Sequence, residues 1–589
     1  MHPYIGSAVN LRSRMMNEQL QELKFLAQKL RLARRGIGSF VRFLGTEAKR
    51  GTLAANLAGL RQGGMAHDMS WAELLEEKAT KHPDRIMLRY KEECYTYRQM
   101  DENANRTANF LLQLGAEQKA GLGIFMRNSP RFLDLFFAAQ KLGMYVVPIN
   151  CELRGDGLQY VINHSDIKFL ACDAELAEPV MMVRDQLKSL KSIIVDDVEE
   201  EAGDFGIPEG VDLLSKAWHP VASTRDPRIG YADRSDKCMI MYTSGTTGRP
   251  KGVVYKVNTS RVKLLSLMAG VLLNKNDVYY TSFSLAHGNA MLLTVTLSMA
   301  MGGTIALARR FSASRFWHDI RRFDVTVFNT IGSIIPILMK QPERPDDRVN
   351  KVRFVLSAAC PTDMWKPFEK RFGVTIYEGY GAVDSGGKGI MNFGTAPVGA
   401  LGKLSKRMGV TRIIDDQGRD CPPGEPGELI FQVKGDGQGV PYYKNEKATN
   451  EKVRDGWMYT GDKVRTDKRG YVYFVGRNTE SMRKGGENVS AYEVEHVIMK
   501  HPAVEDVAVY AVPSDLAEDE IMAAVKLVNG APFAPGDLRD FLSNKIAKFA
   551  VPRYVRVVED FPMTNSHRII KRVLEQEGVT PDAFDALNP

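Results

Sequence analysis

The sequence predicts an α/β protein in which a large N-terminal domain of mixed parallel sheets and helices, with a small β-barrel-like part, precedes a small α+β C-terminal domain. Short β-rich runs such as residues 145–149 and 168–171 alternate with helical segments, which is the pattern of parallel sheets with crossover helices. Residues 410–476 instead contain short strands separated by turn residues. A second, smaller α/β pattern begins near residue 478.

Each element is expected from a local pattern. Helices are expected where apolar residues recur every three or four positions, as at residues 15–35 and 492–500. Strands are expected where short apolar, β-branched or aromatic runs lie between turn residues. These runs are residues 123–126, 145–149, 168–171, 238–241, 278–282, 325–329, 352–356, 412–414, 428–431, 470–475, 507–512 and 522–528.

Size and composition limit the class of protein. A chain of 589 residues with 44% hydrophobic side chains can build several cores. It contains no run of eighteen uncharged apolar residues, so no membrane-spanning helix is predicted. The six cysteines form no CxxC pair, which argues against a zinc site or a disulfide framework and suits a reducing cytosol. No nucleic-acid partner is predicted.

Residues 1–66 form a basic extension. They hold 11 Lys or Arg and 3 Asp or Glu, which is the whole net charge of +8. Leu20, Leu23, Leu26 and Leu30 recur at helical spacing among basic residues, so we expect an amphipathic helix in peripheral contact with the cytoplasmic face of a membrane. The alternative is a helix packed on its own domain with solvated charges. Charges interrupt every candidate apolar stretch, which argues against a cleaved signal peptide.

The segment from Tyr242 to Gly252 has the composition of a phosphate-binding loop. It follows a predicted buried strand, and its glycines let backbone N–H groups approach an anion. Its hydroxyl groups can donate to phosphate oxygens, and Lys251 adds a mobile charge. The proposed contacts are Thr243, Ser244, Gly245, Thr246, Thr247, Gly248 and Lys251. It is not a Walker A loop, and an anonymous run of this kind is often a flexible linker.

A second motif, from Glu378 to Asp384, places an aromatic ring between glycines and then a carboxylate. Tyr380 can stack on adenine, and Asp384 can hold Mg²⁺ against phosphates. Both motifs together resemble those of the adenylate-forming superfamily, which includes acyl-CoA synthetases, luciferases and peptide-synthetase adenylation domains. Val383 and Asp384 stand where that superfamily has threonine and glutamate.

The resemblance implies a full nucleotide site. It assigns Thr246 and Asp384 to Mg²⁺, Asp462 and Arg477 to the ribose, and the turn containing Ala359 and Cys360 to the adenine. The same resemblance assigns the rest of the second motif to ATP or AMP, namely Glu378, Gly379, Tyr380, Gly381 and Val383.

The resemblance also implies a large adenylation domain over residues 67–477 and a small mobile domain over residues 478–589, with the pivot at Thr479. Gly485, Gly486 and Glu487 match the loop that lines the CoA tunnel. Arg568 stands where the family carries a catalytic lysine. Either Arg568 or a shifted Lys571 takes that role, or adenylation is impaired.

Three further segments resemble the fatty acid transport protein group, the very-long-chain acyl-CoA synthetases: residues 150–155, 328–333 and 380–403. The implied acyl pocket contains Leu285, Met291, Ile331, Gly332 and Ile335, although each also suits an ordinary core. His287 is expected beside the substrate carboxylate or as a structural histidine.

The resulting hypothesis is an ATP-, Mg²⁺- and CoA-dependent fatty acyl-CoA synthetase in the cytoplasm, with Lys251, Asp384, Arg568 and His287 as its catalytic residues. The alternatives are a ligase for a small acid of the carnitine or crotonobetaine type, and a lipid- or nucleotide-binding protein with impaired adenylation. The oligomeric state stays open, and a homodimer is one of the states allowed.

Overall fold

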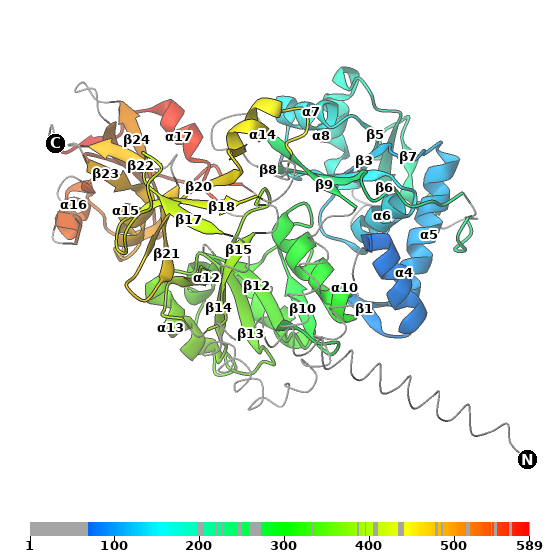
Figure 1. Cartoon of the computed structure of the whole chain (residues 1–589), viewed down its shortest axis with the longest axis horizontal. Helices are drawn as coiled ribbons and strands as arrows, with labels where there is room; N and C mark the ends of the chain where they lie inside the picture. Colours follow the sequence, from blue (N-terminus) through cyan, green and yellow to red (C-terminus); the bar gives the residue numbers. More distant parts are fainter. Residues whose placement is uncertain are drawn as a thin grey trace, which may run out of the picture.

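The protein is described here by a computed structural model (Figure 1). The residues described are 69–197, 205–217, 221–226, 228–243, 250–257, 272–332, 334–385, 388–394, 396–404, 410–433, 441–477, 481–484, 487–513, 519–543, 545–546, 550–564 and 568–587. The predicted basic helix in residues 1–66 therefore lies outside them, as does the pivot at Thr479.

The first large sheet carries the strand that leads into the phosphate-binding loop. Its order is β7 (Asp212–Leu213), β6 (Ser192–Asp196), β5 (Ile167–Asp173), β3 (Gly121–Phe125), β4 (Tyr145–Pro148), β8 (Lys237–Thr243) and β9 (Lys251–Lys256). Every pair from β7 to β8 is parallel, and β9 turns back antiparallel to β8. Its helices are α5 (Tyr97–Gln113), α6 (Pro130–Lys141), α7 (Gly155–His164) and α8 (Ala177–Met182), with 3-10 turns η1 (Ala174–Leu176), η2 (Arg184–Gln186) and η4 (Leu214–Ala217).

The second large sheet lies beside the first (Figure 1). Its order is β15 (Gly389–Asn392), β14 (Ile376–Gly381), β13 (Phe354–Ala358), β12 (Val327–Ile331), β10 (Val278–Thr281), β11 (Thr304–Leu307), β1 (Ile86–Tyr90) and β2 (Glu93–Thr96). The strands from β14 to β1 are parallel, and the two edges are antiparallel. The associated helices are α4 (Trp71–Lys81), α10 (Leu297–Met301), α11 (Ala313–Arg322), α12 (Ile334–Met339), α13 (Thr362–Phe372) and the π-helix η5 (Asn289–Thr296).

One continuous core joins the two sheets, and α6 is its centre. All of α6 except the half-buried Arg131 is buried, and the same core cluster contains residues of both sheets. Ser129 caps the helix by accepting from the Phe132 N–H, and Pro130 occupies the first turn, where its missing N–H costs nothing. The two sheets therefore pack around a shared apolar layer.

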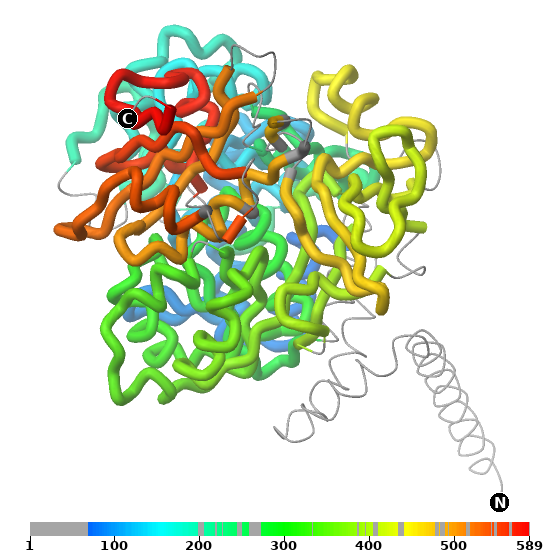
Figure 2. Tube along the Cα trace, turned by 90° about the vertical axis from the view of Figure 1, so that its left-hand side faces the viewer, coloured from blue at the N-terminus to red at the C-terminus, as the bar shows by residue number. Residues whose placement is uncertain are grey.

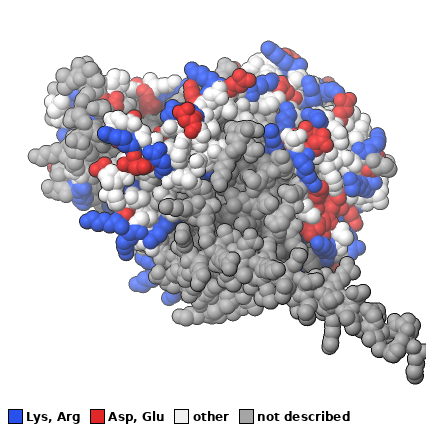
Figure 3. Space-filling model, viewed as in Figure 1, with Lys and Arg blue, Asp and Glu red and all other residues white. Residues whose placement is uncertain are grey.

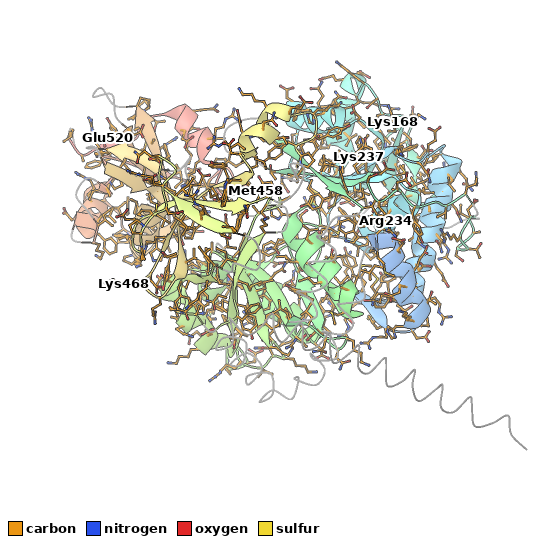
Figure 4. All side chains as sticks on the ribbon, viewed as in Figure 1. Lys168, Arg234, Lys237, Met458, Lys468 and Glu520 are labelled. Carbon is orange, nitrogen blue, oxygen red and sulfur yellow. The ribbon has the colours of Figure 1, made fainter. Side chains whose placement is uncertain are left out.

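A smaller antiparallel sheet follows, in the order β16 (Ala400–Lys403), β21 (Tyr471–Arg477), β20 (Trp457–Thr466), β18 (Gly427–Gln432) and β17 (Thr411–Ile414). The strand β19 (Val453–Arg454) pairs with β20, and α14 (Glu446–Lys452) precedes it. Met458 of β20, labelled in Figure 4, is buried in its core. The strand order is an open path within the described residues, whereas the sequence had suggested a barrel-like part.

The C-terminal domain begins with the hairpin β22 (Ser481–Lys484) and β23 (Glu487–Ser490). It continues with α15 (Ala491–Ile498), β24 (Val504–Pro513), β25 (Asp519–Leu527), α16 (Pro535–Ser543), β26 (Tyr554–Val558), α17 (Lys571–Glu577) and β27 (Phe584–Asp585). Figure 2 shows this orange and red domain above the green second sheet. The helix and both strands predicted after residue 478 are confirmed.

The fold confirms the predicted α/β class with a large domain of parallel sheets and a smaller C-terminal domain. On the face shown in Figure 3, acidic and basic side chains of the described residues are interspersed. Within the part of the chain that the structure describes, no helix combines the length and the apolar character needed to cross a membrane.

Candidate active site

The phosphate-loop segment is held at both ends by the β8–β9 pairing. Thr243 and Lys251 face each other across the two strands, and the Thr243 hydroxyl donates to the Lys251 carbonyl at 3.3 Å. β8 in turn pairs with β4 inside the buried sheet. Five of the predicted phosphate contacts lie outside the described residues, namely Ser244, Gly245, Thr246, Thr247 and Gly248.

Figure 4 labels Lys237, at the start of β8, where an aromatic cluster supports this strand. The Lys237 ammonium lies 4.0 Å from the ring centre of Tyr145 and 4.6 Å from that of Tyr443. The Tyr242 hydroxyl, one residue before Thr243, is 2.7 Å from His164 Nδ1. These contacts hold β8, the strand that precedes the predicted phosphate loop.

Asp384, the predicted metal ligand, is connected to Lys251 through Tyr442. The Lys251 ammonium lies 5.4 Å from the ring centre of Tyr442, and the Tyr442 hydroxyl donates to Asp384 Oδ2 at 2.5 Å. Lys452 Nζ lies 3.0 Å from the same oxygen. Burial alone would raise the pKa of Asp384, but the Lys452 charge and the Tyr442 hydroxyl hold that pKa below its usual value.

The donor set at Asp384 fits Mg²⁺. An ionised carboxylate next to the lysine of a phosphate loop is the type of ligand that Mg²⁺ takes together with substrate phosphates and water. Among the described residues no group of three or more His, Cys, Asp or Glu side chains could hold a metal by itself. The site is therefore suited to a metal that arrives with a nucleotide.

The turn predicted to flank adenine is held by Glu378. The Glu378 carboxylate accepts from the backbone N–H groups of Ala359 and Cys360, and Ala359 has a φ of +61°. Burial raises the pKa of Glu378 to about 7, although the two backbone donors oppose the shift. A Cβ atom on Gly332 would lie 2.2 Å from the Ala359 carbonyl oxygen. The strand end at Gly332 therefore presses directly on this turn.

Two predicted nucleotide contacts meet across the site. The Tyr380 hydroxyl donates to Asp462 Oδ2 at 2.6 Å, although the two residues come from different sheets. Asp462 and Arg477, which the resemblance assigns to the ribose, are opposite each other in the backbone pairing of β20 and β21. Gly461 has a φ of +77°, and its N–H donates to Glu428 at 2.8 Å, so the backbone turns sharply before Asp462.

His287 lies on the loop that leads into the π-helix η5. Its ring is exposed, yet protein atoms surround it closely enough that burial lowers its pKa to about 4, and the Arg568 charge adds to the shift. Asn128 holds the loop by donating to the Phe283 carbonyl at 2.8 Å and accepting from the Leu285 N–H at 2.8 Å.

The predicted acyl-pocket residues differ in how much of their surface is exposed. Leu285, Met291 and Ile335 have no exposed surface and belong to the closed core. Ile331 keeps 8% of its surface, and Gly332 is half-buried. An apolar residue has the same character in a core and in a pocket, so the sequence did not separate the two.

Leu292 and Gly288 of this region were not predicted as site residues. Leu292 and Leu293 of η5 are only partly buried, and Asn329 donates to the Asn289 carbonyl at 3.0 Å, which fixes the start of that helix. A Cβ atom on Gly288 would lie 2.9 Å from Val383. A π-helix often marks a functional site.

The small domain brings Arg568 to the site. The Arg568 N–H donates to the Thr564 hydroxyl at 3.1 Å, and the Thr564 N–H donates to the Arg568 carbonyl at 2.7 Å, so a tight turn presents residue 568. Lys571 is engaged elsewhere, with its ammonium 2.7 Å from Glu495. Of the two candidates for the missing lysine, Arg568 is the one whose charge acts on His287.

Several contacts hold the two domains in this arrangement. Lys340 donates to the Glu505 carbonyl at 2.9 Å, and His496 Nε2 lies 3.9 Å from Asp363. Tyr492 of α15 is close enough to the adenine-flanking turn for the nearby carboxylate of Glu378 to help raise its pKa, after burial. These contacts join the small domain to the large one, with Tyr492 of α15 near the turn that contains Ala359 and Cys360.

Only part of the predicted CoA-binding loop lies within the described residues. Gly485 and Gly486 lie outside the described residues, and Glu487 opens β23, whose backbone pairs with β22. The side chains of Glu487 and Arg477 also lie outside the described set.

Residues 75–443 match the AMP-binding enzyme family, and residues 493–568 match the AMP-binding enzyme C-terminal domain. The chain is 33% identical over 512 residues to the steroid-22-oyl-CoA synthetase of Rhodococcus jostii, covering 84% of this chain and 89% of that protein. It is 34% identical over 465 residues to a medium/long-chain-fatty-acid–CoA ligase of Mycobacterium tuberculosis, covering 78% and 86%.

A third relative, the crotonobetaine/carnitine–CoA ligase of Salmonella typhimurium, is 29% identical over 504 residues. The match covers 82% of this chain and 93% of that protein. Among solved structures, the anthranilate CoA ligase AuaEII in complex with anthranoyl-AMP matches with a TM-score of 0.76 and 25% identity, covering 86% of this chain and 96% of that one. The chain therefore belongs to the AMP-binding enzyme family, the adenylate-forming superfamily whose CoA ligases use ATP, Mg²⁺ and CoA.

Proposed function

We propose that this protein is an acid–CoA ligase that activates medium- to long-chain fatty acids through an acyl-adenylate and then transfers the acyl group to CoA. The observation that carries the proposal is that the charge of Arg568, on the small domain, contributes after burial to the lowered pKa of His287 on the large domain. The fatty-acid ligase among the relatives supports this choice of acid. The partly buried Leu292 and Leu293 beside His287 suit an apolar chain.

The residues have separable roles in the first step. The Arg568 guanidinium attracts the acid carboxylate and offsets the charge that gathers on the α-phosphate as the carboxylate oxygen attacks it. His287 stays neutral because of its lowered pKa, so it does not compete with Arg568 for the carboxylate. Asp462, oriented by the Tyr380 hydroxyl, accepts from the ribose. Mg²⁺ at Asp384 would neutralise the phosphates.

The second step needs a different arrangement of the domains. The CoA thiolate attacks the carbonyl carbon of the acyl-adenylate, and AMP leaves as the carbon–oxygen bond to its phosphate breaks. Splitting one difficult condensation into two activated steps is the advantage of covalent activation. The small domain must move Arg568 away and bring the Gly485–Glu487 segment in, with residues 478–479 as the pivot.

A substrate panel tests the activity. Purified protein is incubated with ATP, Mg²⁺, CoA and acids that range from acetate to very-long-chain fatty acids, and pyrophosphate and AMP are measured. We expect the highest kcat/KM for medium- and long-chain acids. A clear preference for carnitine or crotonobetaine would favour the small-acid alternative, which the third relative supports, and a preference for a sterol side-chain acid would favour the first relative's chemistry.

The pseudoenzyme alternative rests on Arg568 and Val383, which depart from the family motifs. An Arg568→Lys variant separates the two views. If the unmodified protein turns over rapidly, the alternative fails. If only Arg568→Lys forms acyl-adenylate, the protein is a binding protein with decayed chemistry.

Two further properties are proposed from the sequence. The basic extension, residues 1–66, attaches the protein peripherally to anionic membranes, and its deletion should release the protein from anionic liposomes without lowering the activity on soluble acids. Unchanged liposome binding after deletion contradicts this. A homodimer is tested by sedimentation analysis of the full chain.

A further inference from the structure

Lys452 lies where a cation would neutralise Asp384, and no motif assigns it a role. It is the last residue of α14, its Nζ is 3.0 Å from Asp384 Oδ2, and its side chain is 14% exposed. The Asp384 side chain is 17% exposed. Because both side chains are largely withdrawn from water, this pair is screened less than an ordinary surface ion pair.

The position of Lys452 is fixed by its helix. Asn445 caps α14 by accepting from the Ala448 N–H at 2.9 Å, and the Thr449 hydroxyl accepts from the Tyr442 N–H at 3.0 Å. The helix thus holds Tyr442 and Lys452 together. Lys452 Nζ also lies 3.4 Å from the Thr460 carbonyl oxygen.

The pair belongs to a line of charges that leads to the phosphate loop. Tyr442 donates to the same Asp384 oxygen that Lys452 contacts, and Lys251 lies over the Tyr442 ring. Two ammonium groups therefore flank Tyr442 in the region where the triphosphate and its metal are proposed to bind. A metal that uses Asp384 Oδ2 must take the place of the Lys452 ammonium.

We propose that Lys452 is a built-in counter-ion that competes with Mg²⁺ for Asp384. Without nucleotide, Lys452 orients the carboxylate by holding Oδ2. When the nucleotide arrives with its metal, the ammonium leaves Oδ2 and is free to pair with a phosphate oxygen. The cost of breaking this charge-assisted hydrogen bond raises the Mg²⁺ concentration that ATP binding needs. This inference rests on the proposed use of ATP at this site.

The test is ATP binding rather than turnover. Binding of a fluorescent ATP analogue is titrated with Mg²⁺ in the full chain and in Lys452→Met, which keeps the length of the side chain and removes its charge. We expect the half-saturating Mg²⁺ concentration to fall by about tenfold in Lys452→Met, the effect of one charge-assisted hydrogen bond. Lys447→Met, at an exposed position on the same helix, is the matched control and should leave the value unchanged.

Two variants protect the interpretation. Lys452→Arg keeps a cation and should keep a Mg²⁺ requirement close to that of the unmodified protein, whereas Asp384→Asn should remove most of the Mg²⁺ dependence. A half-saturating Mg²⁺ concentration that is unchanged or higher in Lys452→Met overturns the proposal. Normal Mg²⁺-dependent ATP binding without turnover of any acid would instead defeat the proposed ligase activity alone, and no ATP binding by the unmodified protein would overturn both.

Discussion

Gly332→Ala should displace the adenine-flanking turn. The added Cβ would lie 2.2 Å from the Ala359 carbonyl oxygen, and a carbon–oxygen contact needs about 3.3 Å, so the two backbones must separate by about 1 Å. Ala359 cannot yield easily, because Glu378 binds its N–H and its φ of +61° leaves little freedom. Overpacking of this kind costs about 1–3 kcal/mol.

The functional effect should exceed the loss of stability, because a shift of about 1 Å in a binding site can cost about a hundredfold in activity. We expect weaker ATP binding and slower adenylation in Gly332→Ala, measured by analogue fluorescence and by pyrophosphate exchange, with a small loss in thermal stability. Gly157→Ala in α7 is the control, since its Cβ would meet only Leu153 at an ordinary 3.6 Å. Wild-type ATP affinity in a folded Gly332→Ala protein refutes the reasoning.

Three further predictions concern charge and domain contact. Because burial raises the pKa of Glu378 from 4.5 to about 7, the folded protein binds this proton more tightly than the unfolded chain, so stability falls as pH rises from 4.5 to 7. Glu378→Gln should remove that loss, about 3 kcal/mol at pH 8. Unfolding curves that change in parallel for both proteins would contradict this expectation. In Arg568→Met the pKa of His287 should rise from about 4 while staying below its ordinary value, because the positive charge is removed and burial remains. An imidazole titration in NMR spectra that does not shift would place Arg568 away from the ring. Lys340→Ala removes the hydrogen bond to the Glu505 carbonyl, so adenylation should slow by about fivefold while thioester formation from preformed acyl-adenylate is retained. Equal slowing of both half-reactions would show that this contact does not favour the present orientation of the two domains.

The sequence by itself predicted most of the candidate nucleotide site. Glycines, hydroxyl groups and a lysine in fixed order predict a phosphate loop, and Tyr380 and Asp462 were each singled out by short motifs. Their direct contact at 2.6 Å was not readable from the sequence, because it joins strands of two different sheets. The alternation of strands and helices was likewise a local pattern, and the predicted elements of the C-terminal domain are present.

Tertiary structure alone decided three other points. Leu285 and Met291 are equally apolar in a core and in a pocket, and only packing shows that they are closed off. Lys571 lies 2.7 Å from Glu495, whereas the charge of Arg568 contributes to the lowered pKa of His287, and no spacing along the chain reveals this difference. Lys452 reaches Asp384 from a helix far along the chain. A motif indicates which side chains a site contains, whereas the partners of those side chains, such as Lys452 beside Asp384, are brought together only by folding.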